Sequence, residues 1–95
     1  MRVRYTPAAL AHLTEIGDCI ARDNREAAKR VIQAIQSTVE QLRDNPNMGR
    51  RAHLAGTREI VIPRLPYYAA YRVPETAVEV FAVIHAARNW PNKFE

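Results

Sequence analysis

A chain of 95 residues with a formal net charge of +4, 47% hydrophobic residues and 25% charged residues has the composition of an ordinary globular protein. Its length predicts one domain over residues 1–95, because two smaller units would each bury too little surface. No apolar run approaches the roughly 20 residues that span a bilayer, and the polar start lacks the apolar centre of a signal peptide. We therefore expect a cytoplasmic protein without a membrane anchor. A single cysteine and scattered histidines indicate neither an internal disulfide nor a metal site, and no glycine-rich loop indicates a nucleotide cofactor.

The basic side chains are unevenly distributed. Residues 1–48 carry seven basic and six acidic side chains, whereas residues 49–95 carry seven and four, so the positive excess lies in the second half. Twelve of the fourteen basic residues are arginine, whose planar guanidinium binds carboxylates and phosphates through paired hydrogen bonds. This composition permits an acidic protein or a nucleic acid as partner.

The first half of the chain predicts a short strand followed by a helix. We expect the strand at residues 3–5, after which Thr6 offers an N-cap hydroxyl ahead of Pro7, a residue well tolerated at the first helical position. An amphipathic helix should run to about residue 22, with its apolar stripe at Leu10, Leu13, Ile16 and Ile20. Cys19 lies on this helical pattern and is expected to be a small core residue.

A second helix should begin close behind the first. Asp23 with Glu26 three residues later is typical of a capping box. The apolar stripe that follows is longer and comprises Ala28, Val31, Ile32, Ile35, Val39 and Leu42. This helix should end near Asp44, because Asn45 precedes Pro46 and a residue before proline disfavours the helical conformation. Two helices joined so closely predict a helical hairpin.

The second half of the chain changes to a strand pattern. Residues 57–62, 67–73 and 77–85 are rich in valine, isoleucine, tyrosine and phenylalanine and are separated by turns that contain proline. Short connections predict an antiparallel meander, and the nearly continuous apolar run in the last segment predicts a strand inside the sheet. The predicted fold class is α+β: a short N-terminal strand, a two-helix hairpin and a three-stranded antiparallel meander. The helices should pack on one face of the sheet, which leaves the other face free for function.

Arginine and tyrosine side chains alternate along the predicted strands. Arg58 shares a face of its strand with two isoleucines, and on the next strand Tyr67 and Tyr71 lie opposite Arg72. Such a surface suits stacking on bases with contact to phosphates, or the docking of an acidic peptide. The alternative is a solvated sheet face held by cross-strand polar pairs.

His85 and Arg88 stand at the end of the last predicted strand, where functional groups often leave a rigid scaffold. A histidine there could transfer protons, and an arginine could stabilise the charge that develops during RNA cleavage. The structural alternative is a histidine bound to a backbone carbonyl and an arginine paired with Glu59 or Glu79. Trp90 is expected to close the open end of the sheet, and its alternative role is to anchor a partner.

Several spaced motifs occur together along the chain. They are Tyr5-Thr6, Gly56-Thr57-Arg58-Glu59, Pro66-Tyr67, Tyr71-Arg72 and the closing His85-x-x-Arg88-x-Trp90-Pro91. In this combination the chain resembles the RelE/ParE toxins of bacterial type II toxin–antitoxin pairs over nearly its whole length. The resemblance implies a small toxin that a cognate acidic antitoxin holds inactive in a hetero-oligomer, with the C-terminal segment of the antitoxin wrapped around the toxin.

Two activities divide this family. RelE-like members cleave messenger RNA in the ribosome with basic side chains on the sheet and usually a tyrosine near the C-terminus, whereas ParE-like members poison DNA gyrase. Here Arg88 matches a basic position of the RNA-cleaving members. However, Glu59 and Val61 stand where lysines are expected, and Phe94 stands in place of the tyrosine. The pattern therefore predicts a ParE-like gyrase inhibitor.

Other interpretations stay open. One is a ribonuclease with Arg58, His85 and Arg88 as candidate catalytic residues, and another is a degenerate family member without toxicity. For the preferred interpretation, the candidate residues for binding the target or the antitoxin are Arg50, Arg58, Tyr67, Tyr71, Arg72, Arg88, Trp90 and Phe94. No cofactor is expected in either case.

Overall fold

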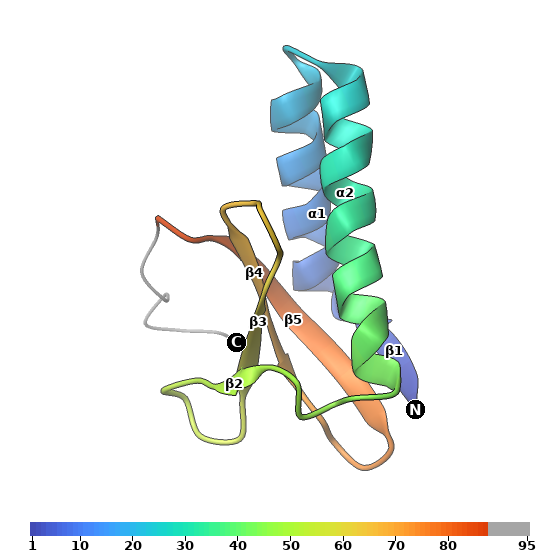
Figure 1. The fold of residues 1–95 in the computed structure, drawn as a ribbon, viewed down its shortest axis with the longest axis vertical. Helices are drawn as coiled ribbons and strands as arrows, with labels where there is room; N and C mark the ends of the chain where they lie inside the picture. Colours follow the sequence, from blue (N-terminus) through green and yellow to red (C-terminus); the bar gives the residue numbers. More distant parts are fainter. Residues whose placement is uncertain (88–95) are drawn as a thin grey trace.

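Residues 1–87 are described by a computed structural model, in which a strand and a helical hairpin precede the remaining strands of one sheet (Figure 1). The elements are β1 (Arg2–Tyr5), α1 (Pro7–Ala21), α2 (Arg25–Glu40), the 3-10 turn η1 (Gln41–Arg43), β2 (Arg50–Arg51), β3 (Arg58–Val61), β4 (Tyr67–Arg72) and β5 (Ala77–His85). The sheet has the strand order β1-β5-β4-β3-β2, with β1 parallel to β5 and the other neighbours antiparallel. The predicted α+β class is confirmed, and β5 lies inside the sheet as predicted.

The helices begin at side-chain caps. Thr6 Oγ1 accepts a hydrogen bond from the backbone N–H of Ala9 at 3.2 Å, and Pro7 opens α1 as predicted. The predicted cap of α2 was one residue early: Asn24, not Asp23, has the extended backbone of an N-cap, and its Oδ1 accepts from Ala27 at 3.0 Å. Within residues 1–87, neither helix is long and apolar enough to cross a membrane.

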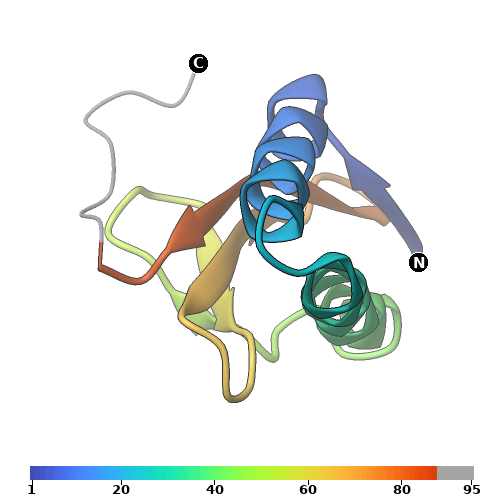
Figure 2. The same cartoon turned by 90° about the horizontal axis from the view of Figure 1, so that it is seen from above.

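The main hydrophobic core lies between the helical hairpin and one face of the sheet. Both helices lie on the same side of the sheet (Figures 1 and 2). The largest fully buried side chains come from both layers: Ile35, Val39 and Leu42 from the helical layer, and Ile62, Tyr71, Val78 and Val80 from the sheet layer. The far end of the hairpin, where α1 meets α2, projects beyond the sheet (Figure 1).

Two predicted core positions of α1 are wrong. Leu10 is 52% exposed, and Cys19 is also exposed. The stripe of α1 that packs on the core runs through Ala9, Leu13 and Ile16. Each residue turns about 100° around a helix axis, so Leu10, which follows Ala9, points away from the sheet. Cys19 lies off the packed stripe for the same reason.

A β-bulge divides the inner strand β5 into two parts. Even-numbered residues of β5 face the helices before the bulge at Val78 and Val80, and face away from them after it at Ala82 and Ile84. The ladder with β4 pairs Ala70 with Ala82 but Tyr71 with Val80, so Phe81 has no cross-strand partner position. Before the bulge, Val80 faces the helices; after it, Ala82 faces away from them. We call the sheet face opposite the helices the open face. A second apolar cluster lies on it, formed by Tyr68, Ala70, Ala82 and Ile84 with Phe81 packed against them.

Candidate functional site

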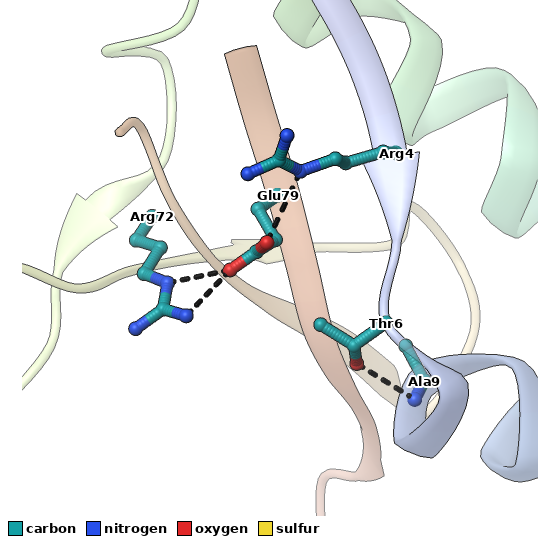
Figure 3. A network of polar contacts seen from close by, with 5 residues as sticks. All are labelled: Arg4, Thr6, Ala9, Arg72 and Glu79. Carbon is teal, nitrogen blue, oxygen red and sulfur yellow. Dashed lines mark hydrogen bonds and ion pairs between the residues drawn. The ribbon is translucent and has the colours of Figure 1, made fainter. Parts of the chain in front are cut away.

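An ion triad crosses the open face from β1 through β5 to β4 (Figure 3). Glu79 accepts a hydrogen bond from Arg4 Nε at 3.1 Å and, through its other oxygen, from Arg72 Nε and Nη2, both at 2.6 Å. The hydrogen bond from Arg72 is the main reason that the pKa of the Glu79 carboxyl lies below its ordinary value, and partial burial acts in the opposite direction. The triad therefore joins three strands through Glu79, and the side chain of Arg72, a predicted binding residue, stays 57% exposed.

We expect the Glu79→Gln variant to lose an acid-sensitive part of the wild-type stability. The folded pKa of Glu79 is lowered, so its contribution is present above the ordinary value of 4.5 and is lost as the pH falls through the lower folded value. In urea unfolding between about pH 5 and pH 3, the free energy of unfolding should therefore fall more steeply with decreasing pH for the wild type than for Glu79→Gln. Glu15→Gln, at an exposed helical position, should keep the wild-type slope. Equal slopes for wild type and Glu79→Gln would contradict the assignment.

A second ion pair lies on the open face between β2 and β3. Arg50 Nε and Nη2 bind Glu59 Oε1 at 2.7 Å and 2.6 Å. The Glu59 residue is only 8% exposed, whereas the Arg50 side chain is 71% exposed. Arg50 therefore neutralises a nearly buried carboxylate and keeps part of its guanidinium available to a partner.

Arg58 and Tyr71 do not lie on the open face, which corrects the predicted arginine–tyrosine surface. Both face the helical side, where Arg58 Nη1 donates to the carbonyls of Gly49 at 2.7 Å and Asn47 at 3.3 Å. Tyr71 is fully buried, so its predicted role in binding is wrong for the folded chain. Its hydroxyl donates to the Pro46 carbonyl at 2.7 Å and accepts from the Gly49 N–H at 2.9 Å. Burial raises the pKa of this phenol. The two side chains fix the loop between η1 and β2.

Tyr67 and His85 are cross-strand partners at the opposite end of β4. Their rings meet edge to face with centroids 5.3 Å apart and an interplanar angle of 82°. His85 is exposed, and its Nδ1 accepts the N–H of Ala87 at 3.1 Å. His85 is therefore bound to the backbone, as in the structural role considered from the sequence, but its partner is a backbone N–H and not a carbonyl. The arrangement leaves Nε2 as the atom that could exchange a proton.

Two of the three candidate ribonuclease residues, Arg58 and His85, lie within the described residues and on different strands. Arg58 is opposite Tyr71, and His85 is opposite Tyr67, on the two sides of β4. Tyr67 and Tyr71 are four residues apart on one strand, which corresponds to about 13 Å. Arg58 Nη1 is held by the carbonyls of Gly49 and Asn47, so part of its guanidinium is already engaged away from His85. Arg88, Trp90 and Phe94 lie outside the described residues.

Apolar side chains occupy the centre of the open face. Tyr68 and Ile84 are 8% and 7% exposed, and Val61 beside them on β3 is 55% exposed. Sequence reasoning missed this cluster because the bulge at Phe81 moves Ala82 and Ile84 to this face. No group of three histidine, cysteine or acidic side chains suited to a metal ion occurs within residues 1–87. The groups that this face exposes are the Val61 side chain and the arginines of the two ion pairs, a combination that suits contact with a protein surface.

The chain is similar to known proteins over nearly its full length. Residues 3–90 match a family model described as the ParE toxin of a type II toxin–antitoxin system, parDE. The chain is 40% identical over 90 residues to toxin Y4kP of Sinorhizobium fredii, which covers 95% of this chain and 93% of that protein. It is 33% identical over 87 residues to toxin RelE2 of Caulobacter vibrioides, covering 92% and 97%. Its fold matches a chain of the chromosomal ParDE TA system from P. aeruginosa with a TM-score of 0.82 and 26% identity, covering 90% of this chain and 95% of that one.

Proposed function

The chain belongs to the ParE toxin family of type II toxin–antitoxin systems, and on this premise we propose that it is a ParE-like toxin that inhibits DNA gyrase by binding it. It acts in the cytoplasm and is neutralised there by a cognate acidic antitoxin, as the similarity to a ParDE toxin–antitoxin system supports. Neither binding step requires a cofactor.

The chemistry at the centre of the open face carries this proposal. RNA cleavage on this face would need cations that hold phosphate charge, in the way that the resemblance implies for RelE-like members. At the two expected lysine positions this chain has the nearly buried carboxylate of Glu59, bound by Arg50, and the exposed apolar side chain of Val61. A carboxylate repels phosphate, and the exposed Val61 side chain suits an apolar contact with a protein. The face therefore suits binding to a protein target better than phosphodiester cleavage.

One observation favours the second candidate, a ribosome-dependent ribonuclease. His85 is exposed at the end of β5 and could still exchange protons through Nε2. Its predicted catalytic companion Arg58 already donates through Nη1 to the carbonyls of Gly49 and Asn47, which leaves fewer of its donors to stabilise phosphate charge. Inhibition of gyrase by binding needs no group that stabilises phosphate charge.

A supercoiling assay with the purified toxin, freed of its antitoxin, tests the proposal. We expect the wild type to inhibit gyrase and to leave ribosome-bound messenger RNA intact. The His85→Gln variant should inhibit gyrase within about twofold of the wild type, because the proposed activity involves no proton transfer. Cleavage of ribosome-bound message with gyrase unaffected would overturn the proposal. If His85→Gln also abolished toxicity but kept antitoxin binding, the ribonuclease would take its place.

A further inference from the structure

Two arginines face each other across the edge of the sheet that β2 and β3 form. Arg51 on β2 is the ladder partner of Arg58 on β3. The next pair along the ladder closes with a hydrogen bond from the Ala52 N–H to the Thr57 carbonyl at 3.0 Å. Hydrogen-bonded and non-hydrogen-bonded pairs alternate, so Arg51 and Arg58 occupy a non-hydrogen-bonded position, where Cα atoms approach to about 4.5 Å and side chains are closest. Like charges directly opposite each other destabilise a sheet.

No carboxylate within residues 1–87 offsets this repulsion. Arg4, Arg50 and Arg72 each bind Glu59 or Glu79 on the open face. Arg58 faces the helical side, where one nitrogen, Nη1, is held by the backbone carbonyls of the loop before β2. Arg51 is exposed and makes no hydrogen bond or ion pair with the described part of the chain. Arg51 and Arg58 are therefore neighbours on one face of the ladder, and both have N–H donors that the described residues do not use.

The outward-facing backbone groups of Arg51 also have no partner strand within the described residues. β2 is the outermost strand of the sheet. At a non-hydrogen-bonded position the N–H and C=O of Arg51 point away from β3, and no described strand lies on that side. An extended peptide could pair with this edge through its main chain. The peptide side chain opposite Arg51 would then lie on the same face as the two guanidinium groups.

We propose that Arg51 and Arg58 form a carboxylate-binding site for an extended acidic segment of the antitoxin, which lies along the outer edge of β2. This inference rests on the proposed function, since it requires that the chain has an antitoxin. A peptide fits better than a nucleic acid because the unpaired backbone of Arg51 and the guanidinium pair coincide, and a nucleic acid makes no use of a strand edge. Binding of one carboxylate turns the repulsion between the arginines into two charge-assisted contacts.

Arg51→Gln tests the site through two measurements that should move in opposite directions. In the free toxin, removal of the repulsion should raise the melting temperature at low salt, and this gain should shrink at about 1 M salt, where the screening length is only about 3 Å. In titrations with the purified product of the adjacent reading frame, the same variant should bind about tenfold more weakly than the wild type. A purely structural role for Arg51 would not combine a more stable toxin with a weaker complex.

Arg22→Gln is the matched control, because Arg22 is exposed at the far end of the hairpin and has no arginine opposite it. It should match the wild type in both measurements, and Arg51→Glu should bind the antitoxin more weakly still. If Arg51→Gln binds as tightly as Arg22→Gln, or if it weakens gyrase inhibition and not antitoxin binding, the inference is wrong. If the wild type itself does not bind the adjacent gene product, the antitoxin part of the proposed function fails first.

Discussion

Replacing Gly49 with alanine should lower the free energy of unfolding by about 3 kcal/mol, the sum expected for an overpacked buried site and a disturbed buried hydrogen bond. A Cβ at this position would lie 2.6 Å from the Tyr71 hydroxyl and 2.7 Å from the Glu59 carbonyl oxygen. Neither atom can move away easily, because the Tyr71 ring is fully buried and the Glu59 carbonyl belongs to the sheet. For a domain of this size the loss corresponds to roughly 12–24 °C in melting temperature.

The other two glycines are controls for this prediction, and thermal unfolding measures all three. A Cβ at Gly56 would meet nothing within 4 Å, but the φ of +77° makes alanine cost about 1 kcal/mol there. At Gly17 a Cβ would lie 3.6 Å from Ile32, an ordinary contact, so Gly17→Ala should stabilise α1 by up to about 1 kcal/mol. If Gly49→Ala costs no more than Gly56→Ala, the close approach to Tyr71 is not what constrains the loop.

Combining Gly49→Ala with Tyr71→Phe separates the two causes. Tyr71→Phe alone removes the hydroxyl that bonds Pro46 and Gly49 and should cost about 1–3 kcal/mol. In the double variant the alanine methyl no longer meets that hydroxyl, so the combined loss should be smaller than the sum of the two single losses. Strict additivity would show that the hydroxyl is not the source of the strain, which would then come from the Tyr71 ring carbon Cε1 and the Glu59 carbonyl oxygen, each 2.7 Å from the added Cβ.

The parts of the fold that the sequence predicted well depend on local information. The cap and first turn at Thr6 and Pro7, the helical stripes and the last strand can each be recognised within a few consecutive residues. β2 could not be predicted in this way, because two residues are too short to show an alternating pattern. This strand exists because its backbone pairs with β3 and Arg50 binds Glu59.

The candidate site was predicted less well because it depends on which face of the sheet the helices cover. Alternation correctly placed Arg58 with Ile60 and Ile62, but it did not tell which face was buried. The two isoleucines were the available signal, since apolar neighbours mark the covered side. The bulge at Phe81 had no comparable signal, because it arises from the register between β4 and β5. The bond between Tyr71 and Gly49 joins residues 22 positions apart, beyond the reach of a local pattern.

The Val61→Lys variant should lose gyrase inhibition by about 10- to 30-fold, if the open face contacts the target as proposed. Val61 is 55% exposed next to the apolar cluster of Tyr68 and Ile84, so it can be changed without disturbing the core. An ammonium group at this position would be desolvated against an apolar interface without a counter-charge, and a loss of about 2 kcal/mol corresponds to this factor. β2 pairs only with Arg58 and Glu59, so no described strand lies on the outer side of β3 at Val61, and lysine is well tolerated at such an edge.

Leu10→Lys is the matched control for this variant. Leu10 is 52% exposed, which is close to the value for Val61, but it lies on α1 and faces away from the sheet. It should therefore retain gyrase inhibition, as measured by supercoiling assays on both variants with circular dichroism to verify folding. The reverse result, with Leu10→Lys inactive and Val61→Lys active, would place the target on the helices.

Val61→Lys also restores a cation where RNA-cleaving relatives are expected to carry one. If the variant gained cleavage of ribosome-bound message, the open face would have retained the other groups of a nuclease, and the distinction between the two activities would depend on this one side chain.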